Sequence, residues 1–85
     1  MTPKQLRELR SRQVTDTGNR LAAAFEITER SQAACVRETK FTAQYVSDMV
    51  RGRFQNISLD NAHEFARFFG CQIEDLFPAR SEAVA

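Results

Sequence analysis

Residues 39–53, TKFTAQYVSDMVRGR, present a row of hydrogen-bonding side chains if this stretch is helical. One face then carries apolar residues at i, i+3 and i+4, namely Val46, Met49 and Val50. The opposite face carries polar residues at i, i+3, i+4 and i+7, namely Gln44, Ser47, Asp48 and Arg51. Amide, hydroxyl, carboxylate and guanidinium groups in such a row can pair with the edges of bases. Since every solvated helix has a polar face, the meaning of this row depends on the elements that position it.

The chain as a whole has the size of one small domain. Its 85 residues suffice for a single core, and 42% hydrophobic with 27% charged residues is typical of a soluble globular protein. No apolar run approaches the roughly 18 residues of a membrane helix, and the N-terminus lacks the apolar segment of a signal peptide. We therefore expect a cytosolic protein that has no membrane partner.

Charge is distributed unevenly along the chain. Residues 1–53 contain ten Lys/Arg and six Asp/Glu, a net charge of +4, whereas residues 54–85 contain two and five, a net charge of −3. A basic front and an acidic rear would orient the molecule toward a polyanion. A solvated surface with uneven charge would give the same numbers, so the asymmetry alone leaves both interpretations open.

Capping residues and glycines divide the chain into helices. Cap signals stand at Thr2-Pro3, Ser31, Thr42 and Ser58, and glycines at 18, 52 and 70 mark helix ends or breaks. The predicted helices cover about residues 3–13, 19–29, 32–38, 43–51 and 59–69, with a final turn at 73–77. No segment shows the period-two alternation of a strand. The predicted fold class is all-α, a compact five- to six-helix bundle. The core-facing set of its longest helix is predicted to be Leu59, Ala62, Phe65, Ala66 and Phe69.

The order of these features in residues 31–77 is specific. Ser31-Gln32 open one helix, Phe41-Thr42 close a short turn, Val46 lies within the next helix and Gly52 ends it. The pattern continues through Ser58-Leu59, Gly70 and Leu76-Phe77. This order resembles the helix-turn-helix family of phage repressors and Cro proteins. The resemblance implies a lambda-repressor-like domain over residues 19–77 with the motif at about 32–51. Residues 1–18 are then an additional N-terminal helix and linker, and residues 78–85 a flexible C-terminal tail.

The chain departs from the family pattern around the turn. The family usually has glycine where Lys40 stands, alanine where Val36 stands, leucine where Cys35 stands and often glutamate where Val50 stands. A left-handed Lys40 would carry strain of about 1–2 kcal/mol. If Lys40 is left-handed, Lys40→Gly should stabilise the protein.

The resemblance implies that helix 43–51 lies in the major groove with its first residues at base edges. The implied base-reading set is Thr42, Ala43, Gln44, Ser47 and Asp48. The Gln44 amide can pair with adenine N6 and N7. Asp48 has two interpretations, which the sequence leaves open. It can accept a hydrogen bond from cytosine N4, or it is a solvated acid that pairs with Arg51 or Arg53.

A second set of residues is placed to contact phosphates. Its implied members are Gln32, Lys40, Arg51, Arg53, Asn56 and Ser58. For each of the arginines, a plain solvated surface charge is an equal alternative.

The leading hypothesis is a sequence-specific transcriptional regulator of repressor or Cro type that binds double-stranded DNA. A domain this small is expected to act as a homodimer on an operator with two inverted-repeat half-sites about one helical turn apart. The alternative is a protein-interaction module, such as an antitoxin or a bridging factor. The N-terminal helix and residues 79–85 would then contact a protein partner.

No residues suggest catalysis, a cofactor or a metal. Nothing resembles a nucleophile–base pair or a pair of catalytic carboxylates, so we expect no enzyme. Cys35 and Cys71 lack the CxxC spacing of a zinc site and are expected to be buried small hydrophobes. His63 is the only histidine and is expected to be structural.

Overall fold

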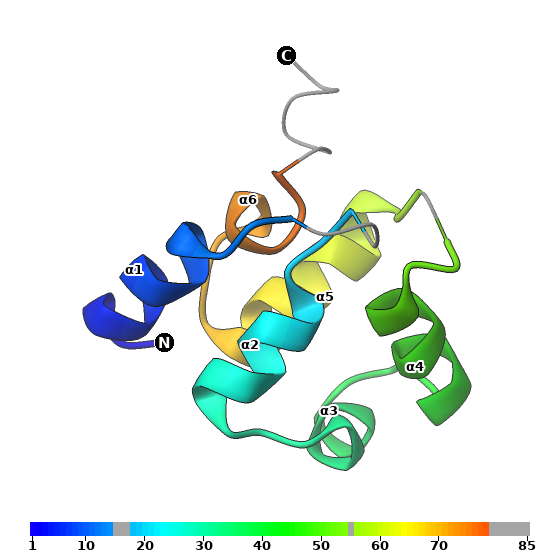
Figure 1. Cartoon of the computed structure of the whole chain (residues 1–85). Coiled ribbons are helices and arrows are strands. Elements are labelled where there is room, and N and C mark those ends of the chain that lie inside the picture. The colour runs from blue at the N-terminus through cyan, green and yellow to red at the C-terminus, as the bar shows by residue number, and fades with distance from the viewer. Residues whose placement is uncertain (15–17, 55, 79–85) are drawn as a thin grey trace.

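The computed structural model describes residues 1–14, 18–54 and 56–78. Six helices and no strand form within these ranges: α1 (Pro3–Ser11), α2 (Leu21–Thr28), α3 (Gln32–Glu38), α4 (Ala43–Arg51), α5 (Leu59–Phe69) and α6 (Ile73–Leu76). The predicted all-α fold class is confirmed. Figure 1 shows α1 and α4 on opposite sides of the molecule, with α2 and α5 between them. Residues 15–17, between the first two predicted helices, and residues 79–85 of the predicted tail lie outside the described residues.

Hydroxyl side chains begin four of the helices. Thr2, Ser31, Thr42 and Ser58 each accept a hydrogen bond from the backbone N–H three residues later, which satisfies a donor that the first turn leaves unpaired. Gly52 and Gly70 end α4 and α5 with φ of 76° and 74°, as predicted. The first helix is shorter than predicted and ends at Ser11. Among the described helices, none is both long enough and apolar enough to cross a membrane.

The core is built around α5. Phe65 is fully buried, and its ring lies 4.5 Å from that of Phe41 and 6.1 Å from that of Phe77, measured between centroids. The predicted burial of Ala62, Phe65, Ala66 and Phe69 is confirmed. The prediction for Leu59 is wrong: this residue is 54% exposed, because it opens α5 at the edge of the bundle.

Phe68 is buried where the sequence pattern did not place a core residue. Its exposed fraction is 9%, and its ring lies 6.3 Å from that of Phe25 on α2. The guanidinium of Arg30 lies 3.9 Å from the centre of the same ring and donates to the Phe68 carbonyl at 2.9 Å. The second apolar face of α5 is therefore covered by an aromatic ring and an arginine.

The left-handed residue is Glu29 and not Lys40. Among the described residues other than glycine, only Glu29 has a positive φ, at 57°, where it ends α2. The left-handed conformation considered for Lys40 does not occur, because Thr39 takes the chain out of α3 in extended conformation. The Thr39 hydroxyl donates to the Cys35 carbonyl at 2.6 Å and accepts from the Phe41 N–H at 3.2 Å. The hydroxyl thus shapes a turn that needs no glycine.

Glycine substitutions at these two positions should therefore change stability in opposite directions. Glu29→Gly relieves a strain of about 1–2 kcal/mol but costs about 0.5–1 kcal/mol in chain entropy, so the free energy of unfolding should rise by up to about 1.5 kcal/mol. Lys40→Gly relieves no strain and should lower it by about 0.5–1 kcal/mol. Urea unfolding of both variants measures the difference. If Lys40→Gly is more stable than Glu29→Gly, the left-handed residue is Lys40 and not Glu29.

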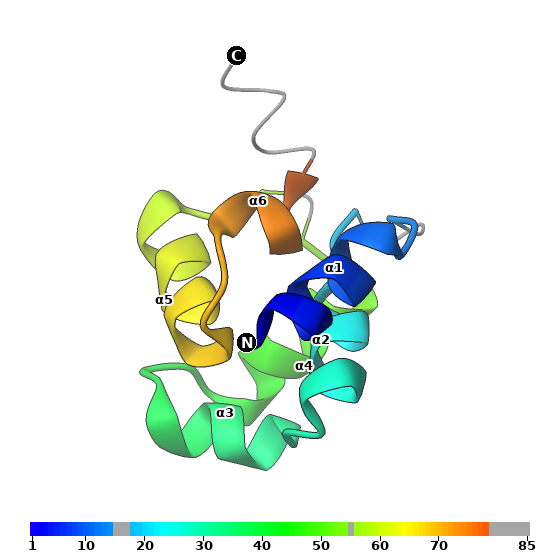
Figure 2. The same cartoon turned by 90° about the vertical axis from the view of Figure 1, so that its left-hand side faces the viewer.

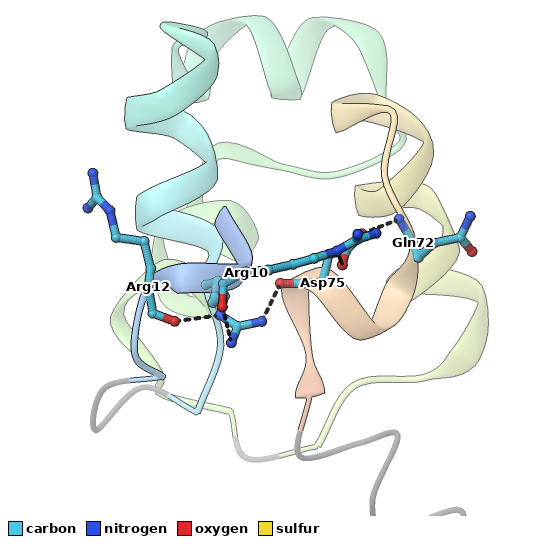
Figure 3. A network of polar contacts seen from close by, with 5 residues as sticks. Arg10, Arg12, Gln72 and Asp75 are labelled. Atoms are coloured by element: carbon cyan, nitrogen blue, oxygen red, sulfur yellow. Dashed lines mark hydrogen bonds and ion pairs between the residues drawn. The ribbon is translucent and has the colours of Figure 1, made fainter. Parts of the chain in front are cut away.

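The N-terminal helix packs on the bundle through α2 and α6. Figure 2 shows α1 beside α6 and in front of α2. Leu9 is fully buried at this contact. The Arg10 guanidinium donates to both oxygens of Asp75, at 2.6 Å to Oδ1 and 3.4 Å to Oδ2, and Arg20 donates to the Asp75 backbone carbonyl at 3.2 Å (Figure 3). A polar network thus joins α1, α2 and α6.

Asp75 is the buried member of this network, with 7% of its side chain exposed. Burial alone would raise the pKa of Asp75, but hydrogen bonds from Arg10 and from the Gln72 N–H outweigh it and hold the pKa below its ordinary value. A carboxylate with a lowered pKa stabilises the fold above its unfolded pKa, which is about 3.9. This contribution is lost as the pH falls through the folded pKa.

Asp75→Asn should therefore lower stability at neutral pH and much less in strong acid. We expect a loss of about 1 kcal/mol at pH 7, at the low end for a charged hydrogen bond because Arg10 is half exposed. The difference from wild type should begin to shrink as the pH falls below about 4, where the Asp75 carboxylate of the unfolded chain takes up a proton, and should vanish below the lowered pKa of the folded protein. Thermal unfolding of both proteins across this range gives the result. A difference that stays constant with pH would mean that the charge of Asp75 contributes nothing.

Candidate nucleic-acid interface

Helices α3 and α4 are joined by a turn of four residues that the rest of the fold holds in place. Ser31 caps α3 and Thr42 caps α4. The Thr42 hydroxyl accepts a hydrogen bond from the Tyr45 N–H at 3.1 Å. The Lys40 N–H in the turn donates to a carboxylate oxygen of Glu64 on α5 at 3.3 Å. The hydrogen bond from Arg67, above all, holds the pKa of Glu64 below its ordinary value. The predicted motif bounds of about 32–51 agree with these two helices.

The inner side of α4 is anchored in the core. Val46 is fully buried and Met49 is 2% exposed, as the apolar stripe predicts, while Val50 is only partly buried. Asn19, a buried residue ahead of α2, donates from its amide to the Met49 carbonyl at 2.9 Å. This hydrogen bond ties the last turn of α4 to the start of α2. The helix that carries the polar row is therefore fixed to its scaffold along its length.

Aromatic residues add a second attachment, which the sequence reasoning missed. Tyr45 on α4 stacks against Phe54 at 5.9 Å between ring centroids and lies 4.9 Å from Phe41. Its hydroxyl accepts a hydrogen bond from the Asn61 amide on α5 at 2.8 Å. Phe41 and Tyr45 are four residues apart, and this spacing could have predicted that their rings lie close together. The aromatic rings set the position of α4 against α5.

The predicted base-reading residues lie on the outward side of α4 and at its cap. Thr42, Ala43 and Gln44 are exposed, and Ser47 and Asp48 are partly exposed. Gln44 donates from its amide nitrogen Nε2 to Oδ1 of Asp48 at 3.0 Å. Nε of Arg53 lies 3.6 Å from the same oxygen. The pairing with Arg53 is the one that the second interpretation of Asp48 named, and Gln44 is a further partner that was not foreseen.

The predicted phosphate-binding residues fall on both sides of α4 in the chain. Gln32 and Lys40 precede it, Arg51 is its last residue, and Arg53, Asn56 and Ser58 follow; all six residues are exposed. A helix such as α4 is about 10–12 Å across with its side chains, which fits the roughly 12 Å width of a major groove. Ser58 differs from the others because its hydroxyl caps α5, where it accepts from the Asn61 N–H at 3.2 Å.

The two cysteines and the histidine are not among the residues predicted to contact DNA. Cys35 is buried, and burial raises its pKa. Cys71 is only partly buried, which differs from the prediction, yet burial and the nearby Asp75 raise its pKa to about 12. His63 is exposed on α5. Within the described ranges, no three His, Cys, Asp or Glu residues come together as a possible metal site.

Comparison with known families agrees with this geometry. The family model of the Cro/C1-type HTH DNA-binding domain matches residues 1–79. The chain belongs to this family of helix-turn-helix DNA-binding domains, and DNA is its partner. The matched region includes α1 and is longer than residues 31–77, on which the sequence resemblance rested. Comparison with curated proteins gave no match, and comparison with solved structures gave none either.

Proposed function

We propose that the protein is a sequence-specific transcriptional regulator that reads the major groove with the first turns of α4. The observation that carries this proposal is the exposed row that begins with Gln44, directly behind the Thr42 cap. The opposite side of the same helix is buried through Val46 and Met49. A polar row on a fixed helix end is what direct readout requires, because base discrimination depends on side chains with defined positions.

Four of the five predicted base-reading residues have a matching partner on a base edge. The Gln44 amide offers a donor and an acceptor, which suits adenine N7 and N6. The Ala43 methyl group can contact a thymine methyl group, and the hydroxyls of Thr42 and Ser47 can pair with several bases. The basic residues Lys40, Arg51 and Arg53 would contact phosphates on either side of the groove. These contacts set position and affinity, while the row supplies specificity.

We further propose that two copies bind an operator with inverted-repeat half-sites. Two large apolar side chains are exposed just beyond α4: Phe54 at 45% and Leu59 at 54%. Apolar surface of this kind is stabilised by burial against a second copy. A two-fold axis near these residues would bring the two α4 helices close together, as half-sites about one helical turn apart require.

Leu59→Gln should weaken self-association without unfolding the monomer. The substitution replaces a half-exposed apolar group outside the hydrophobic core with a polar one, so the melting temperature of the diluted monomer should change little. The dimer dissociation constant should rise by about tenfold or more, because burial of a leucine contributes about 1.5–3 kcal/mol. Sedimentation equilibrium over a range of concentrations measures this. Dimerisation that is unaffected by Leu59→Gln would place the contact elsewhere.

Binding to random duplex DNA at several salt concentrations tests the proposed function and separates it from the alternative of a pure protein-interaction module. A DNA-binding regulator should bind random duplex weakly, with an affinity that falls steeply as salt rises, because bound Lys and Arg displace counterions. An interaction module with a net charge of only +1 should show almost no binding. Absence of any salt-dependent binding would contradict the proposal.

A further inference from the structure

Asp48 differs from the rest of the row because its carboxylate is already occupied. One oxygen, Oδ1, accepts from Gln44 Nε2 at 3.0 Å and lies 3.6 Å from Arg53 Nε. The Arg53 backbone N–H also donates to the Asp48 carbonyl at 3.0 Å. Only 13% of the Asp48 side chain is exposed, against 61% for Arg53. Asp48 therefore lies beneath its neighbours and supports them, with little of its own surface free for a base.

This contact fixes which way round the Gln44 amide lies. An ionised carboxylate can only accept hydrogen bonds, so the amide must turn its nitrogen and not its oxygen toward Asp48. The bond uses one of the two amide hydrogens and leaves the other free, together with the carbonyl oxygen. One donor and one acceptor on the free edge match adenine, which presents N7 as acceptor and N6–H as donor. Guanine presents two acceptors, N7 and O6, and does not match this edge.

We propose that Asp48 is a positioning residue for base recognition. Through the bond from Nε2, it holds the Gln44 amide in the orientation that reads adenine. Its negative charge adds to the selectivity, because it disfavours the two acceptors of guanine more than the mixed edge of adenine. This inference rests on the proposed function and deepens it. It assigns Asp48 to the orientation of Gln44 and not to direct contact with a cytosine.

A structural role for Asp48 would predict a different result from a positioning role. A hydrogen-bonded pair four residues apart on a helix also supports the helix itself to a small extent. Loss of such support would weaken binding to every DNA sequence together. Loss of positioning would change the preference at one base position and leave the other positions as they are. The informative quantity is thus the base preference at the position that Gln44 reads.

Selection of binding sites from a random duplex pool gives this quantity for every position at once. The experiment uses the full chain as wild type, Gln44→Ala and Asp48→Ala. Glu74→Gln controls for the loss of one negative charge, since Glu74 is exposed on α6, far from α4 in Figure 1. The wild type should select an adenine at one position per half-site, and Gln44→Ala should abolish that preference alone.

Asp48→Ala should lower the adenine-to-guanine ratio at this same position by about fivefold or more, the lower bound for one bidentate contact. Preferences elsewhere should remain, and binding to random duplex should be equal or tighter because a negative charge near phosphates is gone. Asp48→Asn, which keeps the size of the side chain and loses the charge, should lower the same ratio by a smaller factor. Glu74→Gln should select the wild-type site.

Two results would overturn the inference while the proposed function stands. In the first, Asp48→Ala and Asp48→Asn select the same adenine as wild type while Gln44→Ala does not. In the second, the Asp48 variants lose affinity for selected and random DNA alike, which would make the residue structural. If the wild type itself selects no common sequence, the proposed function fails, and the inference fails with it.

Discussion

Phe65→Ala is expected to lower the free energy of unfolding by about 3–5 kcal/mol, enough to leave much of the protein unfolded at 25 °C. Phe65 is fully buried, and its ring lies within 6.3 Å of those of Phe41, Tyr45 and Phe77. Removal of the ring leaves a cavity that three further aromatic rings border. Because these rings also fix the turn and α4, DNA binding should fail together with the fold. Circular dichroism during urea unfolding measures the loss.

His63→Ala is the matched control for this experiment. His63 lies on the same helix two residues earlier, and its side chain is exposed. Its removal should change stability by no more than about 0.5 kcal/mol, as for most surface substitutions. Equal unfolding midpoints for the two variants would mean that the buried face of α5 has been assigned wrongly.

Gln44→Ala and Arg53→Ala should weaken DNA binding in two distinguishable ways. Gln44 is exposed at the start of α4, where its amide would meet a base edge. Its loss should cost about 1–3 kcal/mol on the operator and leave binding to random duplex nearly unchanged. Arg53 follows Gly52, where its guanidinium would meet a phosphate. Its loss should weaken binding to operator and random DNA alike and reduce the salt slope by about one per subunit.

Titration of both variants against operator and scrambled duplex at several salt concentrations gives these quantities. Arg53→Ala also removes one of the two partners of Asp48, so repulsion from phosphates should add to the loss. Should Gln44→Ala lose as much affinity on scrambled duplex as on the operator, α4 does not read bases through this residue.

Helix boundaries could be predicted from the sequence where they depend on local chemistry. Ser31, Thr42 and Ser58 each bond a backbone N–H three residues away, and Gly52 and Gly70 adopt the left-handed conformation that ends a helix. Both devices act within one turn of the chain, so residue type and spacing suffice to find them. Glu29 shows the limit of this reasoning. It adopts the left-handed conformation without being glycine, and its residue type does not predict this conformation.

Contacts between distant parts of the chain could not be predicted. The burial of Phe68 depends on contacts with Phe25, which lies on α2, and with Arg30, which directly precedes the cap of α3. The pair of Arg10 and Asp75 joins residues 65 positions apart. Periodicity assigned Leu59 to the core because it is apolar, and only the placement of the α5 start shows that it is exposed.

Some features of the candidate site could likewise be predicted from local spacing, and others could not. The polar row on residues 43–51 follows from helical spacing, and the structure places Ala43 and Gln44 on the exposed side as expected. Asp48 had two interpretations, and residue type and spacing offered no means to choose between them. Its contacts with Gln44 and Arg53 depend on side-chain directions and on the path of the chain after Gly52.

The most direct test of a major-groove reading helix exchanges a single nitrogen atom of the DNA for a C–H group. Each adenine of the selected operator is replaced in turn by 7-deazaadenine, which lacks the N7 acceptor, and wild type and Gln44→Ala are titrated against each duplex. At one adenine per half-site, the wild type should lose affinity by about fivefold or more. Gln44→Ala should lose nothing further there, because its contact to that atom is already absent. If wild type and Gln44→Ala respond equally at every adenine, Gln44 does not contact the major-groove edge, and the assignment of α4 as the reading helix is contradicted.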